Sequence, residues 1–325
     1  MDWQQLWEIT SAPDNVPIVA LIFLVPFYVW YGFRQAFAND RLIEQLEANP
    51  ELAKTHHRKT LPFQSGWAKE VPVWPYLLRM EFLAAVIVTV ILFVWSITLN
   101  APLEEPANPS ITMNPAKAPW YFLGLQEMLV YFDPWMAGVI LPTLIVVGLM
   151  AIPYMDMNPL GNGYYTYKQR RFAIWTFCIG FIGLWVAMVV IGTFIRGPGW
   201  MWFWPGATWD HSRLIFEINR DLDQIVAGMF SWLGLLSVSE FFRNIWSRSV
   251  FGALVTGLYF ALAGFGIHKL ILSTEFNRKV YARMTLLQYL TLQMLLTLML
   301  LLPVKIALRL LFRIKYIWVT PWFNI

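Results

Sequence analysis

The sequence predicts an all-α, polytopic membrane protein with six or seven transmembrane helices and amphipathic interfacial helices. Its composition and its long apolar runs are the observations that predict this. Hydrophobic residues make up 58% of the 325 residues, charged residues make up 14%, and the mean hydropathy is +0.52. Because a soluble domain is usually about a quarter charged, the bilayer is expected to be the main solvent. The small net charge of +4 is spread over loops and favours lipid headgroups over nucleic acid as the charged partner.

The expected spans follow from the length of each apolar run. A transmembrane helix needs roughly 20 mostly apolar residues to cross about 30 Å of hydrocarbon. Six runs meet this requirement, at residues 16–33, 83–99, 136–154, 172–194, 250–272 and 285–303. A shorter run at residues 225–238 could be an interfacial helix or a seventh span.

The N-terminal part is expected to hold an anchor helix followed by a small polar region. The first 15 residues contain Asp2, Glu8 and Asp14 and lack the positive start of a cleavable signal, so we expect residues 16–33 to be retained. Residues 40–53 predict a short polar helix, and residues 60–75 predict an irregular loop with prolines. Together they are too small for a core of their own. The single cysteine, Cys178, has no partner for a disulfide, a Cys-x-x-Cys metal site or covalent haem attachment.

The distribution of basic residues predicts the topology, because Lys and Arg in short loops stay on the cytoplasmic side. The loop between Arg34 and Arg79 is rich in basic residues, and so is the segment Lys168-Gln-Arg-Arg171, so both are expected inside. The loop at residues 100–135, with Glu104, Glu105, Glu127 and Asp133 against a single Lys117, is then outside. The N-terminus is expected outside as well.

The C-terminal part contains two basic clusters that cannot both be inside, because one span separates them. The first is formed by Arg278, Lys279 and Arg283, and the second follows Pro303. With six spans the tail is outside, and with seven it is inside; six is the preferred count. Residues 306–316 have the pattern of an amphipathic helix along the headgroups, with tryptophans behind it as interface anchors.

Two proline-rich motifs lie in the loop at residues 100–135, Pro106-Ala-Asn-Pro109 and Lys117-Ala-Pro-Trp-Tyr-Phe-Leu123. This segment resembles the loop of the quinol-oxidation pocket in the C-terminal half of cytochrome b, where Pro-Glu-Trp-Tyr-Phe-Leu follows Pro-Ala-Asn-Pro. The resemblance is specific over residues 79–154 and looser up to residue 272. It divides the chain into an anchor part at 1–78, a cytochrome b C-terminal-like domain at 79–272 and an added C-terminal part at 273–325, with a membrane helix and a basic amphipathic tail.

The residues of the second motif are suited to a quinol pocket. Such a pocket needs an apolar slot, a polar group for the ring oxygen and an exit for protons. Pro119, Trp120, Tyr121, Phe122 and Leu123 are the expected quinol-binding residues, and the Tyr121 hydroxyl could bond to a ring oxygen, which makes Tyr121 a candidate catalytic residue. The alternative is an ordinary belt of aromatic residues at the headgroups.

One residue departs from the motif, because Pro119 stands where the family has glutamate. Proline cannot accept a proton, so if the family's chemistry is retained another acid must receive a quinol proton. Glu127 is the nearest candidate along the chain and could share a helical face with Trp120. Glu127 could equally be a solvated acid at the interface.

The histidines and a second aromatic segment complete the candidate sites. His56, His57 and His211 are expected in loops and His268 near the end of a span, so paired axial haem ligands are not expected in this chain and no metal site is predicted. The segment at residues 196–205, followed by Trp209, could be a lid over the slot, a docking surface or part of an aromatic belt.

The resemblance implies a membrane subunit of a quinol-oxidising complex of bc type, an oxidoreductase. It implies menaquinone or ubiquinone as cofactor, haem b in a partner subunit that forms the other cytochrome b half, and an iron–sulfur or c-type cytochrome subunit as acceptor. The expected location is an energy-transducing membrane, such as the bacterial inner membrane. The rival hypothesis is a non-catalytic anchor that holds redox subunits. A transporter is disfavoured because the spans are expected to lack buried charges.

Overall fold

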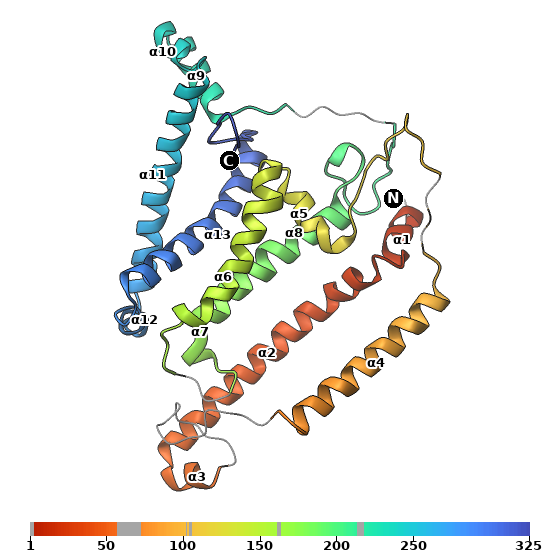
Figure 1. The fold of residues 1–325 in the computed structure, drawn as a ribbon, viewed down its shortest axis with the longest axis vertical. Coiled ribbons are helices and arrows are strands. Elements are labelled where there is room, and N and C mark those ends of the chain that lie inside the picture. Colours follow the sequence, from red (N-terminus) through yellow and green to blue (C-terminus); the bar gives the residue numbers. More distant parts are fainter. Residues whose placement is uncertain (1–2, 57–72, 102, 104–105, 161–163, 213–217) are drawn as a thin grey trace. The chain divides into compact units, whose positions relative to one another are not determined.

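The structure is a computed structural model that describes residues 3–56, 73–101, 103, 106–160, 164–212 and 218–325 (Figure 1). The chain forms two compact units. The first comprises Met1–Met113, Pro159–Trp175 and Pro205–Thr208, and the second comprises Asn114–Asn158, Thr176–Trp204 and Trp209–Ile325. The described residues contain helices and isolated β-bridges but no strand, so the predicted all-α class is confirmed.

The helices follow the predicted apolar runs. The N-terminal elements are α1 (Trp3–Ser11), α2 (Val16–Ala48), α3 (Pro50–Thr55) and α4 (Tyr76–Thr98). The middle elements are η1 (Trp120–Phe122), α5 (Leu123–Met128), η2 (Met136–Ile140), α6 (Leu141–Met155), α7 (Tyr167–Phe177), η3 (Cys178–Val186), α8 (Ala187–Val190), η4 (Ile191–Ile195) and η5 (Pro198–Trp200). The C-terminal elements are α9 (Leu222–Trp232), α10 (Leu236–Phe241), α11 (Ile245–Leu272), α12 (Glu275–Tyr281) and α13 (Leu286–Phe312).

Six helices of the described chain are long and apolar enough to cross a membrane, and they coincide with the six predicted spans. They are Val16–Ala48, Tyr76–Thr98, Met136–Met155, Tyr167–Ile195, Ile245–Leu272 and Leu286–Phe312. The third combines η2 and α6, and the fourth runs continuously from α7 through η3 and α8 to η4. The prediction of a polytopic membrane protein is therefore confirmed.

The short apolar run at residues 225–238 is divided between two short helices, α9 and α10. They are separated at Gly234, whose φ of 78° is readily adopted only by glycine among the common residues. The 11 residues of α9 cover only about 16 Å, roughly half of the hydrocarbon thickness. The run is therefore too short to be the alternative seventh span, and the six-span count holds for the described residues.

The C-terminal tail lies on the same end of the second unit as the Trp120 loop, as six spans require. The Asn324 amide donates to Asp133 Oδ2 at 3.4 Å, and Ile325 packs against the buried core. The tail is fixed by backbone hydrogen bonds, including that from Leu222 N to Tyr316 O at 2.9 Å.

Two expectations for the last helix were wrong. Pro303 does not end it, because α13 continues to Phe312, so residues 306–312 belong to the spanning helix and no separate interfacial helix forms there. Lys305 is 0% exposed rather than at the headgroups, and its ammonium lies 5.4 Å from the centre of the Phe132 ring and donates to Lys315 O. The expectation that the spans lack buried charges was also wrong, so it no longer argues against a transporter.

In the first unit, the polar helix expected at residues 40–53 is the end of α2, followed by the short helix α3. Asp40 is buried and accepts from Lys168 N, and Lys168 also pairs with Glu44. These contacts bring together two basic segments that were predicted on one face. Most of the irregular loop predicted at 60–75, together with His57, Glu104 and Glu105, lies outside the described residues.

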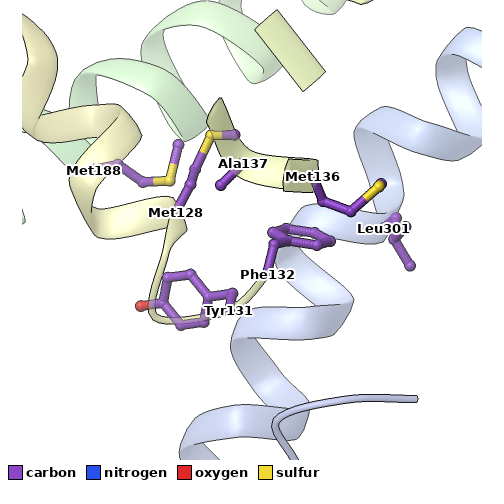
Figure 2. Close-up of a cluster of buried hydrophobic side chains, with 7 residues drawn as sticks. All are labelled: Met128, Tyr131, Phe132, Met136, Ala137, Met188 and Leu301. Atoms are coloured by element: carbon purple, nitrogen blue, oxygen red, sulfur yellow. The ribbon is translucent and has the colours of Figure 1, made fainter. Parts of the chain in front are cut away.

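The core of the second unit lies at the start of the third span. Figure 2 shows seven buried side chains packed together, with Phe132 beside Met136 and Leu301. The cluster consists of Met128, Tyr131, Phe132, Met136, Ala137, Met188 and Leu301. It joins the segment after α5 to α8 and α13, so it fixes the position of the loop that carries the Trp-Tyr-Phe motif.

Candidate functional site

The Trp-Tyr-Phe motif forms the single turn η1, and α5 follows directly. On α5, Leu123, Gly124, Glu127 and Met128 are buried. Leu125, Gln126 and Leu129 lie on the opposite side of this helix because successive residues are about 100° apart. The segment therefore has one face packed into the protein and another that is free to line a site.

The buried face of α5 lies very close to the fourth span. A Cβ atom at Gly192 would lie 3.3 Å from Leu123 O, and one at Gly124 would lie 3.1 Å from Val189 Cγ2. Two glycines thus allow close packing, as small residues commonly do between membrane helices. This contact sets the depth of α5 and the direction of both of its faces.

Glu127 lies at the centre of a buried polar network and is 0% exposed. Its Oε1 accepts from Arg196 Nη2 at 2.6 Å and from the Tyr131 hydroxyl at 2.9 Å. Its Oε2 accepts from Arg196 Nε and Trp200 Nε1, both at 3.0 Å. Burial, and secondly the charge of Glu127, raises the pKa of Tyr131, so the phenol stays protonated and donates. Glu127 is therefore not a solvated interfacial acid, and that alternative was wrong.

The segment after the fourth span is a tight hairpin that completes this network. Arg196 and Trp202 form an antiparallel bridge, and the Arg196 guanidinium lies 4.4 Å from the centre of the Trp202 ring. Gly197 permits the reversal, because a Cβ atom there would lie 2.5 Å from Phe203. The hairpin is tied to the preceding loop by the bond from Gly199 N to Asn114 Oδ1 at 2.5 Å. It positions Trp200 over Glu127.

An open cavity of about 550 Å³ lies beside the other face of α5. It is lined mainly by apolar surface from the residues Ala116, Lys117, Ala118, Phe122, Leu125, Gln126, Leu129 and Gly138. Gln126 holds the wall formed by residues 116–118, since its amide donates to Ala116 O at 2.7 Å and its carbonyl accepts from Ala118 N at 2.8 Å. Ligand sites typically have volumes of about 300–1,000 Å³, a mainly apolar lining and a few polar groups.

The predicted quinol-binding residues are distributed unevenly around this cavity. Phe122 lines it, whereas Leu123 is buried against the fourth span. Tyr121 is 52% exposed, and its ring contacts those of Trp120 and Phe122. Trp120, Tyr121 and Pro119, which precedes η1, are not among the lining residues.

Glu127 lies on the face of α5 opposite the cavity. The hairpin at residues 196–203 contributes no lining residue, so the hairpin does not act as a lid in this conformation. Trp204, just after the hairpin, is 82% exposed, as a docking surface or an aromatic belt would require. These two alternatives for the second aromatic segment stay open.

Each of the three described histidines contacts another group of the chain. The His268 ring bonds to the Tyr289 hydroxyl, the His56 ring lies 3.3 Å from the Tyr164 hydroxyl, and His211 Nδ1 lies 2.7 Å from Asn114 O. No two of these histidines face each other in the contacts of the described chain. Within the same residues no group of three or more His, Cys, Asp or Glu side chains could hold a metal ion.

Sequence reasoning missed several lining residues, above all Lys117, Gln126 and Gly138. The signal for part of them was present, because Phe122, Leu125, Gln126 and Leu129 have the spacing i, i+3, i+4 and i+7 of one helical face. Lys117 precedes this helix in the sequence and Gly138 follows it, so whether they line the cavity depends on how the chain folds around the helix. The Arg196 partner of Glu127 is 69 residues away and left no local signal.

The fold and this site define an all-helical polytopic membrane protein with an apolar cavity beside a proline-rich aromatic loop at one membrane end. Residues 106–196, which contain the loop, α5, α6 and the fourth span, match the family described as Cytochrome b(C-terminal)/b6/petD. The predicted resemblance is thereby confirmed over this segment. The matched segment comprises 91 of the 325 residues. Comparisons with curated proteins and with solved structures gave no match.

Proposed function

We propose that this chain forms the quinol-oxidation pocket of a bc-type electron-transfer complex and that quinol binds in the cavity beside α5. The observation that carries the proposal is the coincidence of the cavity with the segment that matches the family. Its size and apolar lining suit a benzoquinone or naphthoquinone head, so either ubiquinone or menaquinone would fit. The Tyr121 ring contacts the rings of both Trp120 and Phe122, and these aromatic side chains would shield the entrance.

The remaining redox groups belong to partners in this proposal. A second subunit with the haem-bearing half of cytochrome b would take one electron, and an iron–sulfur or c-type cytochrome subunit would take the other. The membrane would be an energy-transducing one, such as the bacterial inner membrane. The N-terminus, the Trp120 loop and the C-terminal tail would all lie on its outer, proton-releasing face. This orientation rests on the basic residues of the opposite loops.

The structure favours a positioning role for Glu127. Its carboxylate accepts four hydrogen bonds and lies away from the cavity, so it holds Arg196 and Trp200 in place. Its role as proton acceptor stays a prediction. A proton could reach Glu127 only if part of the network opened, because both oxygens are already engaged.

Gly138 offers a direct test, because it lines the cavity and a Cβ atom there would meet nothing within 4 Å. Gly138→Leu should narrow the cavity without disturbing the packing and lower quinol oxidation by the purified complex at least about tenfold. The matched control is Gly257→Leu, on α11, where the added Cβ also meets nothing within 4 Å. Equal turnover in the two variants would contradict the cavity as the quinol site.

The rival proposal, a non-catalytic anchor, makes a different prediction for the unaltered complex. If the complex neither oxidises quinol nor binds inhibitors that compete for a quinol pocket, yet dissociates without this chain, the anchor is the better description. The departure at Pro119 is what favours it.

A further inference from the structure

One of the residues that line the cavity has a polar side chain that could take over the chemistry expected of the glutamate absent at position 119. Lys117 and Gln126 are the polar side chains among the residues that line it. Gln126 uses its carbonyl and one amide hydrogen to hold the backbone of residues 116–118. An amide also has no useful basicity at neutral pH. Lys117 is therefore the lining side chain with acid–base chemistry to offer.

The contacts of Lys117 leave part of its amine free. Its Nζ donates to Thr193 O at 2.8 Å and lies 5.1 Å from the centre of the Trp209 ring. No carboxylate within 4.0 Å pairs with Lys117 in the described part of the chain. A neutral amine has two N–H groups and one lone pair, so it can keep the bond to Thr193 and still accept a proton from a ligand.

Burial makes the neutral amine of Lys117 easier to reach than that of an exposed lysine. Burial lowers the pKa of Lys117 to about 8. The charged groups on the elements around it are engaged elsewhere, since Glu127 and Arg196 pair with each other and Asp210 accepts from Ser212. The His211 ring contacts the Trp209 ring and bonds to the backbone of Asn114.

We propose that the neutral Lys117 amine accepts the first proton of quinol, which makes Lys117 a catalytic residue of this site. The O–H bond of the quinol breaks, an N–H bond forms at Nζ, and the products are a quinolate anion and the Lys117 ammonium. No electron moves in this step. The ammonium lies beside the anion and stabilises it until the proton leaves to the outer aqueous phase. This inference rests on the proposed function, because it needs quinol in the cavity.

Three variants test the proposal in the purified complex. Lys117→Gln removes the base, and Lys117→Arg keeps a positive charge and a donor for Thr193 but cannot accept a proton in the working pH range. Both should lower kcat/KM for quinol about 100-fold at pH 8. In the unaltered protein kcat/KM should rise with pH through a midpoint near pH 8 and level off above it, and this rise should be absent in both variants. The control Lys279→Gln, at an exposed pair with Glu275, should behave like the unaltered protein.

The outcomes separate this inference from the proposed function. If Gly138→Leu stops quinol oxidation but Lys117→Gln keeps both kcat/KM and its pH dependence, quinol binds in the cavity and Lys117 is not the base. If Lys117→Arg restores activity while Lys117→Gln does not, charge alone is needed and proton acceptance by Lys117 is refuted. If neither Gly138→Leu nor Lys117→Gln changes turnover, the cavity is not the quinol site and both proposals fall.

Discussion

The ion pair between Glu127 and Arg196 is expected to stabilise the chain strongly, and a double-mutant cycle can measure its contribution. Both partners are almost completely buried, at 0% and 1% exposed. In Glu127→Gln, an amide NH₂ replaces one carboxylate oxygen, so two of the four donors around it lose their acceptor. A buried donor without a partner costs about 1–3 kcal/mol.

We therefore expect Glu127→Gln to lower the free energy of unfolding by about 3–5 kcal/mol, as for other buried pairs that lose one partner. At about 1.4 kcal/mol per factor of ten, this is a change of roughly 10²–10⁴ in the folding equilibrium. The variant should thus impair assembly and not only quinol oxidation. Arg196→Met should have a cost of similar size.

The assay is denaturant unfolding of the full-length chain in detergent micelles, followed by the circular dichroism of its helices. The loss of unfolding free energy in the double variant should be about 2–3 kcal/mol smaller than the sum of the losses in the two single variants. The reason is that either change alone already breaks the ion pair. Glu275→Gln, in an exposed pair, is the control and should leave the unfolding midpoint unchanged. A coupling energy below about 0.5 kcal/mol would refute the account of Glu127 as the centre of the network.

Two further predictions concern the walls of the site. Gly197→Ala should open the hairpin, because its Cβ atom would lie 2.5 Å from Phe203, and should lower the free energy of unfolding by about 1–3 kcal/mol in the same assay; an unchanged midpoint would show that the hairpin adjusts freely. Gln126→Leu should release the cavity wall and raise KM for quinol about tenfold through the loss of two hydrogen bonds. Gln35→Leu, on α2, removes a side chain that donates to the Tyr31 hydroxyl and is the control, and equal KM values in the two variants would contradict the role of Gln126 in holding the wall.

The spans could be predicted because a bilayer requires little more of a helix than length and apolarity. The incorrect predictions for α13 arose because tertiary packing outweighed a rule based on neighbouring residues in the sequence. Pro303 was expected to end its helix, but α13 continues through it, as membrane helices often do when neighbours and local adjustments satisfy the freed backbone groups. The basic cluster after Pro303 was expected along the headgroups, but the ammonium of Lys305 lies against the Phe132 ring and donates to a backbone carbonyl of the folded tail.

The sequence motif correctly predicted which segment lies at the site, but it did not predict the roles of the individual residues. The motif from Lys117 to Leu123 does lie at a cavity, yet Phe122 is its one aromatic lining residue and Glu127 points away. Whether Glu127 faces lipid, cavity or protein is decided by Arg196, which is distant in sequence. The burial of a charged side chain cannot be predicted from its neighbours in the sequence, because it depends on whether a partner pairs with that charge in the folded protein.

The sequence by itself determined the class of the protein, its six membrane helices and the loop at which a quinol site should be sought, since hydropathy and a specific motif are properties of consecutive residues. The tertiary structure alone decided which side of α5 is open, that Lys117 and Gly138 meet at one cavity and that Glu127 is locked against Arg196. These depend on close contacts, such as those at Gly124 and Gly192, between segments more than 60 residues apart. A contact of this kind forms only when the whole unit has packed.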